Sequence, residues 1–296
     1  MPEHVEGSEG VYVVDTRMFG VEEQTAAFVI DADRPAVVDT GLESDAPRVV
    51  KAVDEIGIER EDVEYVVVTH VHLDHAGGVG LVAEAFPNAT VVVHERGVKY
   101  LVDDKSAQRL VEKVHEAVGP LADAYGGIET VARDRVVGVS PPDALDLGDR
   151  TLEVVKAEGH APHHFALYDD ASRSLFVIDE GCAYVDGREL PTTPPPDFDL
   201  DATLESFERF EGYDAETLLY GHYGVNYDGV DAIPRHREAL LNWVDEIRTA
   251  RDEHDHTHEI VDAVVENHPE AAENEITRQV MERDVGGVLG YLRDGP

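Results

Sequence analysis

The spacing of apolar residues predicts alternating strands and helices over the first 230 residues of the chain. Apolar residues at helical spacing predict helices at 45–56, 78–86, 97–122 and 201–210. Short apolar runs between turn residues predict strands at 11–14, 26–30, 36–38, 65–69, 90–93, 151–155, 165–168, 174–178 and 217–220. Strands that alternate with helices in this way indicate an α/β fold.

The pattern changes towards the C-terminus. Residues 190–199 carry four prolines and are expected to form a loop. After Ile233 the spacing is helical, and Leu240, Leu241, Val244 and Ile247 are expected on one helix face. We therefore divide the chain into a domain at 1–232 and a helical C-terminal extension at 233–296. The extension could roof a site or form a homodimer contact.

Acidic residues dominate the composition. The chain has 63 Asp and Glu against 24 Lys and Arg, a formal net charge of −39, and the acids are spread along its whole length. Net charge of this size bears on solubility and solvent rather than on fold. We interpret it as adaptation to concentrated salt; an acidic surface for a basic partner is the alternative. The sequence has no basic patch with interleaved aromatic residues, so nucleic acid is not an expected partner.

Composition also bears on location. The chain has no apolar run of the length that spans a membrane, and its N-terminus is acidic rather than basic and apolar. Cys182 is the single cysteine, which excludes an internal disulfide and a cysteine-rich zinc site. We expect a cytoplasmic protein, not associated with membranes, that acts on a small molecule.

The most informative stretch is VVVTHVHLDHAGGVG, from Val66 to Gly80. Four potential metal ligands, His70, His72, Asp74 and His75, follow directly after a predicted buried strand. Imidazole and carboxylate groups together suit Zn, Mn or Fe(II). Two histidines two residues apart can hold one ion from a short loop, and the adjacent Asp74 and His75 can turn towards a second. The pattern predicts a metal centre.

The motif THVHLDHAGG resembles the HxHxDH signature of the metallo-β-lactamase fold superfamily. Four further elements resemble that family in the same order, namely Asp39-Thr40-Gly41, Gly159 to His164, Leu175 to Asp179 and Leu219 to Gly224. The resemblance covers most of residues 10–230. It implies an αββα four-layer sandwich, in which two β-sheets lie face to face with helices outside.

The resemblance also implies a ligand set for two divalent metal ions, with zinc expected first and iron or manganese as alternatives. One ion would be held by His70, His72 and His160, and the other by Asp74, His75 and His222, with Asp179 bridging the two. A hydroxide between the ions would be the nucleophile, and Asp74 would be the catalytic residue that orients it.

Other residues near these motifs have roles that the sequence leaves open. His163 stands where the family usually has glycine, and it could face the substrate or lie in solvent. His164 is expected to support a ligand rather than to bind metal. Tyr184 and Tyr223 each follow a ligand closely and could bind substrate or simply pack. Glu180 follows Asp179 where a small residue is common.

We predict a dinuclear metal hydrolase of a small ester, thioester or lactone, similar to the hydroxyacylglutathione hydrolase (glyoxalase II-like) and lactonase branches. An anionic substrate would need arginines of the extension, such as Arg235, Arg237, Arg248 or Arg251. The alternative is a mononuclear iron sulfur (persulfide) dioxygenase on the same fold, which metal identity would distinguish. A phosphodiesterase or nuclease is a further alternative, but it would need a basic arm or an extra domain.

The charge leads to a prediction on salt. At ~0.01 M salt the Debye length is about 30 Å, so carboxylates repel one another across the whole protein, whereas at ~1 M it is about 3 Å. The free energy of unfolding of a folded protein is only about 5–15 kcal/mol, so repulsion among many carboxylates can unfold the chain. We expect the melting temperature to rise between roughly 0.05 and 3 M KCl, and equimolar sucrose to replace the salt only in part. A melting temperature that is flat or falling would instead favour an acidic surface kept for a basic partner.

Overall fold

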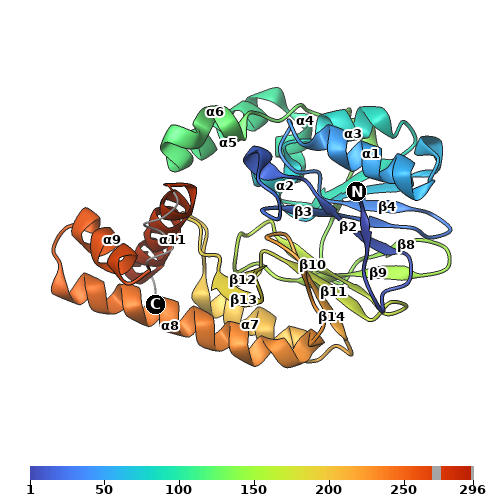
Figure 1. The fold of residues 1–296 in the computed structure, drawn as a ribbon. Coiled ribbons are helices and arrows are strands. Elements are labelled where there is room, and N and C mark those ends of the chain that lie inside the picture. The colour runs from blue at the N-terminus through green and yellow to red at the C-terminus, as the bar shows by residue number, and fades with distance from the viewer. Residues whose placement is uncertain (269–274, 295–296) are drawn as a thin grey trace.

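Two β-sheets lie face to face, and helices cover the outer face of each, in the computed structural model, which describes residues 1–268 and 275–294. In Figure 1 the layers run from top to bottom as helices, first sheet, second sheet and helices. The αββα sandwich expected from the resemblance is therefore confirmed.

The first sheet has seven strands in chain order. Its first four strands pair antiparallel and the last four pair parallel. Parallel neighbours need crossover connections, which helices supply here. The strands are β1 (Glu3–His4), β2 (Val11–Asp15), β3 (Ala26–Ile30), β4 (Ala36–Val38), β5 (Tyr65–Val68), β6 (Thr90–His94) and β7 (Val136–Val139).

The second sheet has six strands in the order β15-β14-β11-β10-β9-β8. Only β11 and β14 pair in parallel, so both end at the same edge of the sheet. Its strands are β8 (Ala144–Asp146), β9 (Thr151–Lys156), β10 (Phe165–Asp169), β11 (Ser174–Ile178), β14 (Thr217–Tyr220) and β15 (Val225–Asn226). A separate hairpin consists of β12 (Cys182–Val185) and β13 (Arg188–Pro191).

Helices occupy the outer layers. Those on the first sheet are α1 (Ala46–Ile56), α2 (Leu73–Ala76), α3 (Val79–Ala85), α4 (Val98–Val102), α5 (Asp104–Val118) and α6 (Ala122–Tyr125). The others are α7 (Leu200–Phe210), α8 (Ile233–Glu253), α9 (Thr257–Glu266) and α11 (Glu275–Asp294). Short 3-10 helices lie at Met18–Gly20, Arg60–Asp62, Gly119–Leu121, Arg133–Arg135 and Gly229–Ala232.

Apolar contacts join the layers. Between the sheets, the rings of Phe28 and Phe176 meet edge to face with centroids 5.3 Å apart. Val49 of α1 and Val244 of α8 belong to the two outer cores. The central strands are thus buried on both faces, which is why they read in the sequence as continuous apolar runs. Leu241 is 38% exposed and does not share the buried face of α8, contrary to expectation.

The helix expected at 97–122 is broken. Asp103 has an extended backbone and its carboxylate accepts a hydrogen bond from the Ser106 N–H at 2.9 Å, which starts α5 as a new helix. An N-cap of this kind satisfies a donor that the helix itself cannot. The strands that the sequence did not predict are short or partly exposed, namely β1, β7, β8, β12, β13 and β15.

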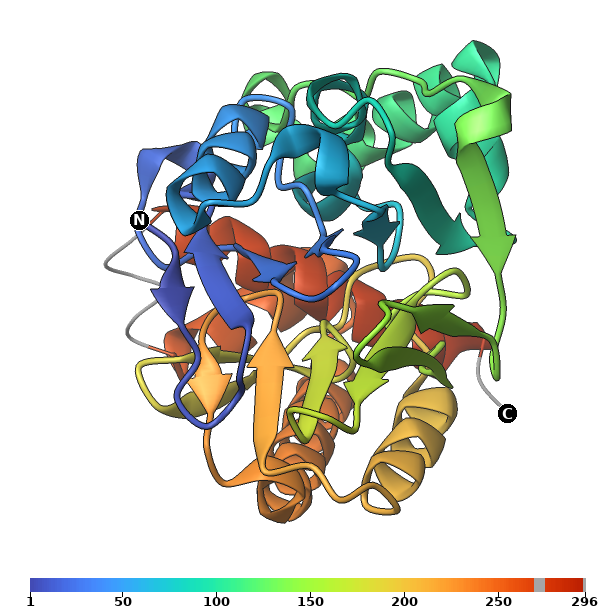
Figure 2. The same cartoon turned by 90° about the vertical axis from the view of Figure 1, so that its right-hand side faces the viewer.

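The C-terminal helices pack beside the sandwich. Helix α11 lies below α5 and α6 and crosses the end of the two sheets (Figures 1 and 2). The Thr193 hydroxyl donates to the Asp284 carbonyl oxygen at 2.9 Å, and the Trp243 indole donates to Thr193 at 3.1 Å. The proline-rich loop therefore ties α11 to α8. Division into two domains at residue 232 stays a prediction.

No helix in the described ranges combines the length and the apolar character that crossing a bilayer requires.

Candidate metal centre

The seven predicted ligands converge at one end of the sandwich. His70 follows β5, Asp179 follows β11 and His222 follows β14, while His160 lies in the loop after β9. Strand ends are rigid, so they place these side chains without flexible connections. Three overlapping groups have donor atoms within 4.8 Å of one another, and these are His70–His72–His160, His70–His75–Asp179 and Asp74–His75–His222.

The Asp179 carboxylate lies at the middle of these groups. Its Oδ2 is 3.3 Å from His75 Nε2 and 3.4 Å from His222 Nε2. The same oxygen is 3.5 Å from His160 Nε2 and 3.8 Å from His70 Nε2. Asp179 therefore faces both groups of histidines, which is the place that a bridging ligand would occupy.

The remaining ligands form one group on each side of Asp179. On one side, His160 Nε2 lies 3.0 Å from His72 Nδ1. On the other, His222 Nε2 lies 3.4 Å from both Asp74 Oδ2 and His75 Nε2. Nitrogen and carboxylate oxygen donors in these numbers are typical of sites for divalent zinc, iron or manganese.

Hydrogen bonds orient the imidazoles. The buried Asp39 carboxylate accepts from His75 Nδ1 at 2.9 Å, so the Nε2 of His75 faces the centre. The Thr69 hydroxyl donates to Asp39 at 2.9 Å, and its oxygen lies 3.2 Å from His70 Nδ1. His222 Nδ1 donates to the Gln24 carbonyl oxygen at 2.9 Å. Partners of this kind fix the ring orientation and raise the basicity of a ligand.

Several buried atoms lack a protein partner. Among the described residues, His70 Nε2, His160 Nδ1 and Asp179 Oδ1 accept or donate no hydrogen bond. A buried polar group without a partner costs about 1–3 kcal/mol. Two of these atoms, His70 Nε2 and Asp179 Oδ1, belong to residues that meet at the centre, and metal ions would satisfy them. The residues present therefore fit divalent ions.

The protonation states of the histidines bear on whether they can bind divalent ions. Burial lowers the pKa of His70 and of His160, which keeps both imidazoles in the neutral form that binds metal. Burial also opposes a charge on His222, but the carboxylates of Asp179 and Asp74 raise its pKa to about 10. Ions would have to displace the proton of His222, so their binding would release protons.

Glu180 supports the loop that carries His160. Its buried carboxylate accepts from the backbone N–H groups of Gly159 and His160, at 3.0 and 3.1 Å. Burial raises the pKa of Glu180 to about 7, although these N–H groups and Ser206 lower it. Gly159 lies so close to Thr203 that a side chain there would collide with α7.

His164 contacts the backbone of Asp179, and its role as a supporting residue rather than a metal ligand stays a prediction. Its ring is fully buried, and its Nδ1 donates to the Ala157 carbonyl oxygen at 2.7 Å. Its Nε2 then accepts from the Asp179 N–H at 3.5 Å. His164 and Glu180 thus hold the backbone on either side of the centre.

The other three candidate residues lie in different places. The His163 ring is 8% exposed and its centroid is 5.8 Å from that of His72, so it borders the centre. Tyr184 stacks on Tyr220, with centroids 5.2 Å apart, and its N–H donates to the His222 carbonyl oxygen at 2.7 Å. Tyr223 lines a separate pocket.

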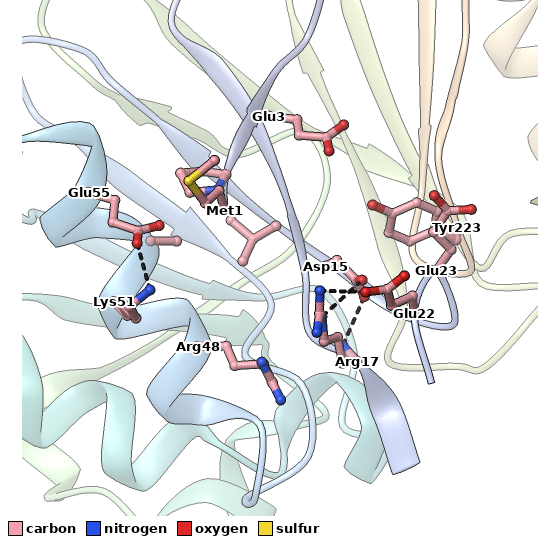
Figure 3. A pocket seen from close by; sticks show the side chains of 13 residues that line it. Met1, Glu3, Asp15, Arg17, Glu22, Glu23, Arg48, Lys51, Glu55 and Tyr223 are labelled. Atoms are coloured by element: carbon pink, nitrogen blue, oxygen red, sulfur yellow. Dashed lines mark hydrogen bonds and ion pairs between the residues drawn. The ribbon is translucent and has the colours of Figure 1, made fainter. Parts of the chain in front are cut away.

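That separate pocket has a volume of about 370 Å³ and holds none of the predicted ligands. Figure 3 shows that its charged side chains come from β1, β2, α1 and the loop after β2, and that several of them pair with one another. Arg17 contacts Glu22 at 2.6 Å, and Lys51 contacts Glu55 at 2.6 Å. It is a polar depression beside the first sheet, and it brings none of the predicted metal ligands to Tyr223.

The family model for the metallo-beta-lactamase superfamily matches residues 20–222, which include every predicted ligand. The chain belongs to the metallo-beta-lactamase superfamily. The match ends at His222, so α8, α9 and α11 lie outside it.

Curated relatives cover part of the chain. The metallo-beta-lactamase fold-containing protein ST1585 of Sulfurisphaera tokodaii is 32% identical over 167 residues, which are 56% of this chain and 62% of that protein. The N-acyl homoserine lactonase AttM of Agrobacterium fabrum is 32% identical over 181 residues, 58% of this chain and 63% of that protein. The matches thus span less than two thirds of these relatives.

Solved structures agree on the fold over almost the whole chain. The crystal structure of ST1585 superposes with a TM-score of 0.71 at 22% identity and covers 95% of this chain and 98% of that chain. A metallo-beta-lactamase family protein, TTHA1429 of Thermus thermophilus, gives a TM-score of 0.71 at 18% identity, with 96% and 93% covered. Identities this low show the fold alone.

Asp39, Thr69 and Glu180 act through the ligands, and the sequence had not assigned them that role. Asp39 stood in the quoted Asp39-Thr40-Gly41 element, so its place after a strand was the available signal. In the sequence, Glu180 stood out only because the family commonly has a small residue at this position. The buried Glu180 carboxylate, next to the buried Asp179, needs hydrogen-bond donors of its own. Those donors are the N–H groups of Gly159 and His160, about twenty residues away in the sequence.

The Glu180 contacts predict the effect of Glu180→Gln. The amide would turn an N–H donor towards the Gly159 or His160 N–H, so the loop would shift and His160 would lose its position. Losses of about 10–100-fold in metal affinity are typical of such supporting residues. We expect a loss in this range, measured by competition with a chelator. Glu158→Gln, on the same loop but in surface ion pairs with Arg96 and Lys156, is the matched control and should leave the affinity unchanged.

Proposed function

We propose that this chain is a dinuclear metal-dependent hydrolase that opens lactones or closely related small esters. The observation that carries the proposal is the pair of ligand groups on either side of Asp179, each of which is complete. A non-catalytic metal protein would need one group, and two adjacent groups are typical of metal-assisted hydrolysis.

The bound ions would supply a nucleophile at neutral pH, by lowering the pKa of water to about 7, and would polarise the substrate carbonyl. Asp74 would accept a hydrogen bond from the attacking water and take up its proton. Burial disfavours a charged Asp74, but the hydrogen bond from His222 and nearby imidazoles lower its pKa well below the ordinary value. The carboxylate is therefore ionised and can accept a hydrogen bond from the water.

A covalent route through cysteine has no support in the structure. Cys182 is fully buried, and burial raises the pKa of its thiol far above the ordinary value. Its Sγ faces the His236 carbonyl oxygen at 3.9 Å rather than the metal centre. Direct attack by water on the carbonyl therefore fits the chain better.

The choice of lactones rests on the relatives and on the ligands. Proteins named N-acyl homoserine lactonase share 24–35% identity with parts of this chain. A lactone needs only a nucleophile and a polarised carbonyl, which this centre would provide without a further catalytic group. Thioester hydrolysis of the glyoxalase II type is a second candidate that the same ligands would serve.

Zinc is the ion that we propose, because each position would have four ligands, all of them histidines or carboxylates, which suit zinc. A small-molecule substrate, a cytoplasmic location and the absence of nucleic acid or membrane partners stay predictions from the sequence, as does a homodimer. His163 borders the centre and burial lowers its pKa to about 2, so it would meet the substrate as a neutral imidazole.

Metal analysis followed by a substrate panel tests the proposal. Protein prepared in concentrated salt without added metal should contain close to two zinc ions per chain. It should open N-acyl homoserine lactones and simple γ-lactones faster than it hydrolyses bis(4-nitrophenyl) phosphate. One iron per chain, with oxygen uptake in the presence of glutathione persulfide, would instead establish the dioxygenase.

The position of Asp74 predicts the outcome of Asp74→Asn. The amide keeps the shape but cannot take up a proton and binds metal weakly, so we expect lactone hydrolysis to fall at least tenfold. The His70–His72–His160 group does not include Asp74 and should keep its ion. Asp123→Asn, on the exposed face of α6, is the matched control. Full activity of Asp74→Asn with one ion per chain would contradict the dinuclear mechanism.

A further inference from the structure

The backbone that carries Asp179, the predicted bridging ligand, is strained. Ile178, the last residue of β11, has a φ of 55°, in the left-handed region that β-branched residues rarely adopt. A residue persists in such a conformation only where the surrounding structure holds it there. The position of the Asp179 carboxylate therefore depends on contacts from outside β11.

Hydrogen bonds from three sides hold this turn. The Gly221 N–H, which follows β14, donates to the Ile178 carbonyl oxygen at 3.1 Å. The Asp179 N–H donates to His164 Nε2 at 3.5 Å. The Thr192 hydroxyl donates to the Asp179 carbonyl oxygen at 2.6 Å. The contact from Thr192 is the shortest of the three, and it comes from the proline-rich loop rather than from the second sheet.

Thr192 contacts the turn twice. Besides the bond of its hydroxyl to Asp179, its N–H donates to the Gly181 carbonyl oxygen at 3.1 Å. The two carbonyl groups belong to the residues on either side of Glu180. Both Thr192 and Asp179 are buried, so water cannot readily replace a lost hydroxyl. A shift of Thr192 would therefore release the backbone that carries the predicted bridging ligand.

The neighbouring residue, Thr193, contacts the C-terminal extension. Its hydroxyl donates to the Asp284 carbonyl oxygen of α11 at 2.9 Å and accepts from the Trp243 indole of α8 at 3.1 Å. Gly287 of α11 lies so close to the Thr193 carbonyl that any side chain there would collide with it. One turn of α11 thus packs directly on the backbone of the proline-rich loop, which is yellow in Figure 1.

These contacts form a continuous path from α11 to Asp179. Thr192 and Thr193 are adjacent and buried, so a displacement of one is passed on to the other. Chains of packed residues and hydrogen bonds of this kind can carry energetic coupling between two sites. The strain at Ile178 supplies the second condition, because the turn would relax once its contacts were lost.

We propose that Thr192 is a positioning residue for Asp179, and that α11, seated on Thr193, keeps Thr192 in place. Seating of α11 and binding of the metal ions would then stabilise each other, since coupling between two sites is reciprocal. The extension, which lies outside the family match, would thereby act on the metal centre. The inference rests on the dinuclear centre of the proposed function but not on its substrate.

Substitutions at Thr192 test the positioning role. Thr192→Val removes the hydroxyl and keeps the shape of the side chain, whereas Thr192→Ser keeps the hydroxyl. Competition with a chelator measures the zinc affinity, and the visible absorption of the cobalt(II)-loaded protein reports the geometry of the ligands. We expect Thr192→Val to lose about tenfold in zinc affinity and to change the cobalt spectrum, and Thr192→Ser to restore both. An unchanged affinity and spectrum in Thr192→Val would overturn the positioning role.

Gly287→Ala tests the contribution of α11. The added methyl group would collide with Thr193, whereas Gly290→Ala places the same group on the same helix with nothing within 4 Å and is the matched control. Hydrogen exchange of the metal-free protein in molar KCl measures local opening. We expect Gly287→Ala to speed exchange in α11 and at the amides of Asp179 and Thr192, and to lower the zinc affinity roughly fivefold or more.

Three results would overturn the role of α11. They are faster exchange in α11 with no change at Asp179 or in zinc affinity, unchanged exchange in α11, and an equal effect of Gly290→Ala. If Gly287→Ala does not fold, Thr193→Val removes the hydroxyl that donates to Asp284. It should speed exchange at Asp179, and unchanged exchange there counts against the inference.

Addition of zinc gives the reverse test and separates this inference from the proposed function. Zinc should slow exchange in α11 of the unaltered protein, and Thr192→Val should remove most of that effect. Equal slowing in Thr192→Val would show that Thr192 does not carry the coupling. A chain that binds no zinc would reject the dinuclear hydrolase, while exchange at Asp179 in metal-free Gly287→Ala would still decide whether α11 holds the turn.

Discussion

The buried Asp179 carboxylate is the group on which the metal centre depends. It lies 3.3–3.8 Å from four imidazole nitrogens and is 2% exposed, so its charge has no water to stabilise it. A charge in such a place needs paired partners, because burial without them costs several kcal/mol. The histidines alone supply this only when protonated, and divalent ions would supply it while the histidines are neutral. Loss of the ions would thus destabilise the whole end of the sandwich.

This constraint explains why most ligands follow strands of the central sheets rather than lie on the peripheral helices. Ligands follow β5, β9, β11 and β14, which are held by pairing with their neighbours, and β11 and β14 are buried throughout. Helices α6 and α11 lie at the periphery and carry none of the seven predicted ligands. Function depends on the site rather than on the fold, so the peripheral helices can differ between relatives that keep the same ligands.

The same division decides what the sequence could predict. The ligands sit in local motifs directly after strands, and β3, β4, β11 and β14 have the bounds that their apolar runs predicted. β1 and β8 are short and largely exposed, so they give no apolar run, whereas the equally short β4 is apolar and buried. The seating of α11 carried no signal, because it depends on the hydrogen bond between the Thr193 hydroxyl and the Asp284 carbonyl oxygen, which are 91 residues apart in the sequence. The arginines of α8 that the sequence offered for an anionic substrate contact other parts of the chain, and their role with a substrate stays a prediction.

The net charge and the buried ion pairs of this chain respond differently to salt. The formal charge of −39 repels an anion from every side, and in dilute buffer this repulsion extends about 30 Å from the surface. In molar salt the repulsion is screened beyond about 3 Å, whereas contacts between a partly buried guanidinium and a carboxylate are screened much less. Exposed ion pairs such as Arg237 with Glu211 contribute about 0–1 kcal/mol and weaken further. Concentrated salt would therefore lower the electrostatic barrier that this surface sets against any anionic molecule, and would leave buried charge contacts such as those of Asp179 nearly unchanged.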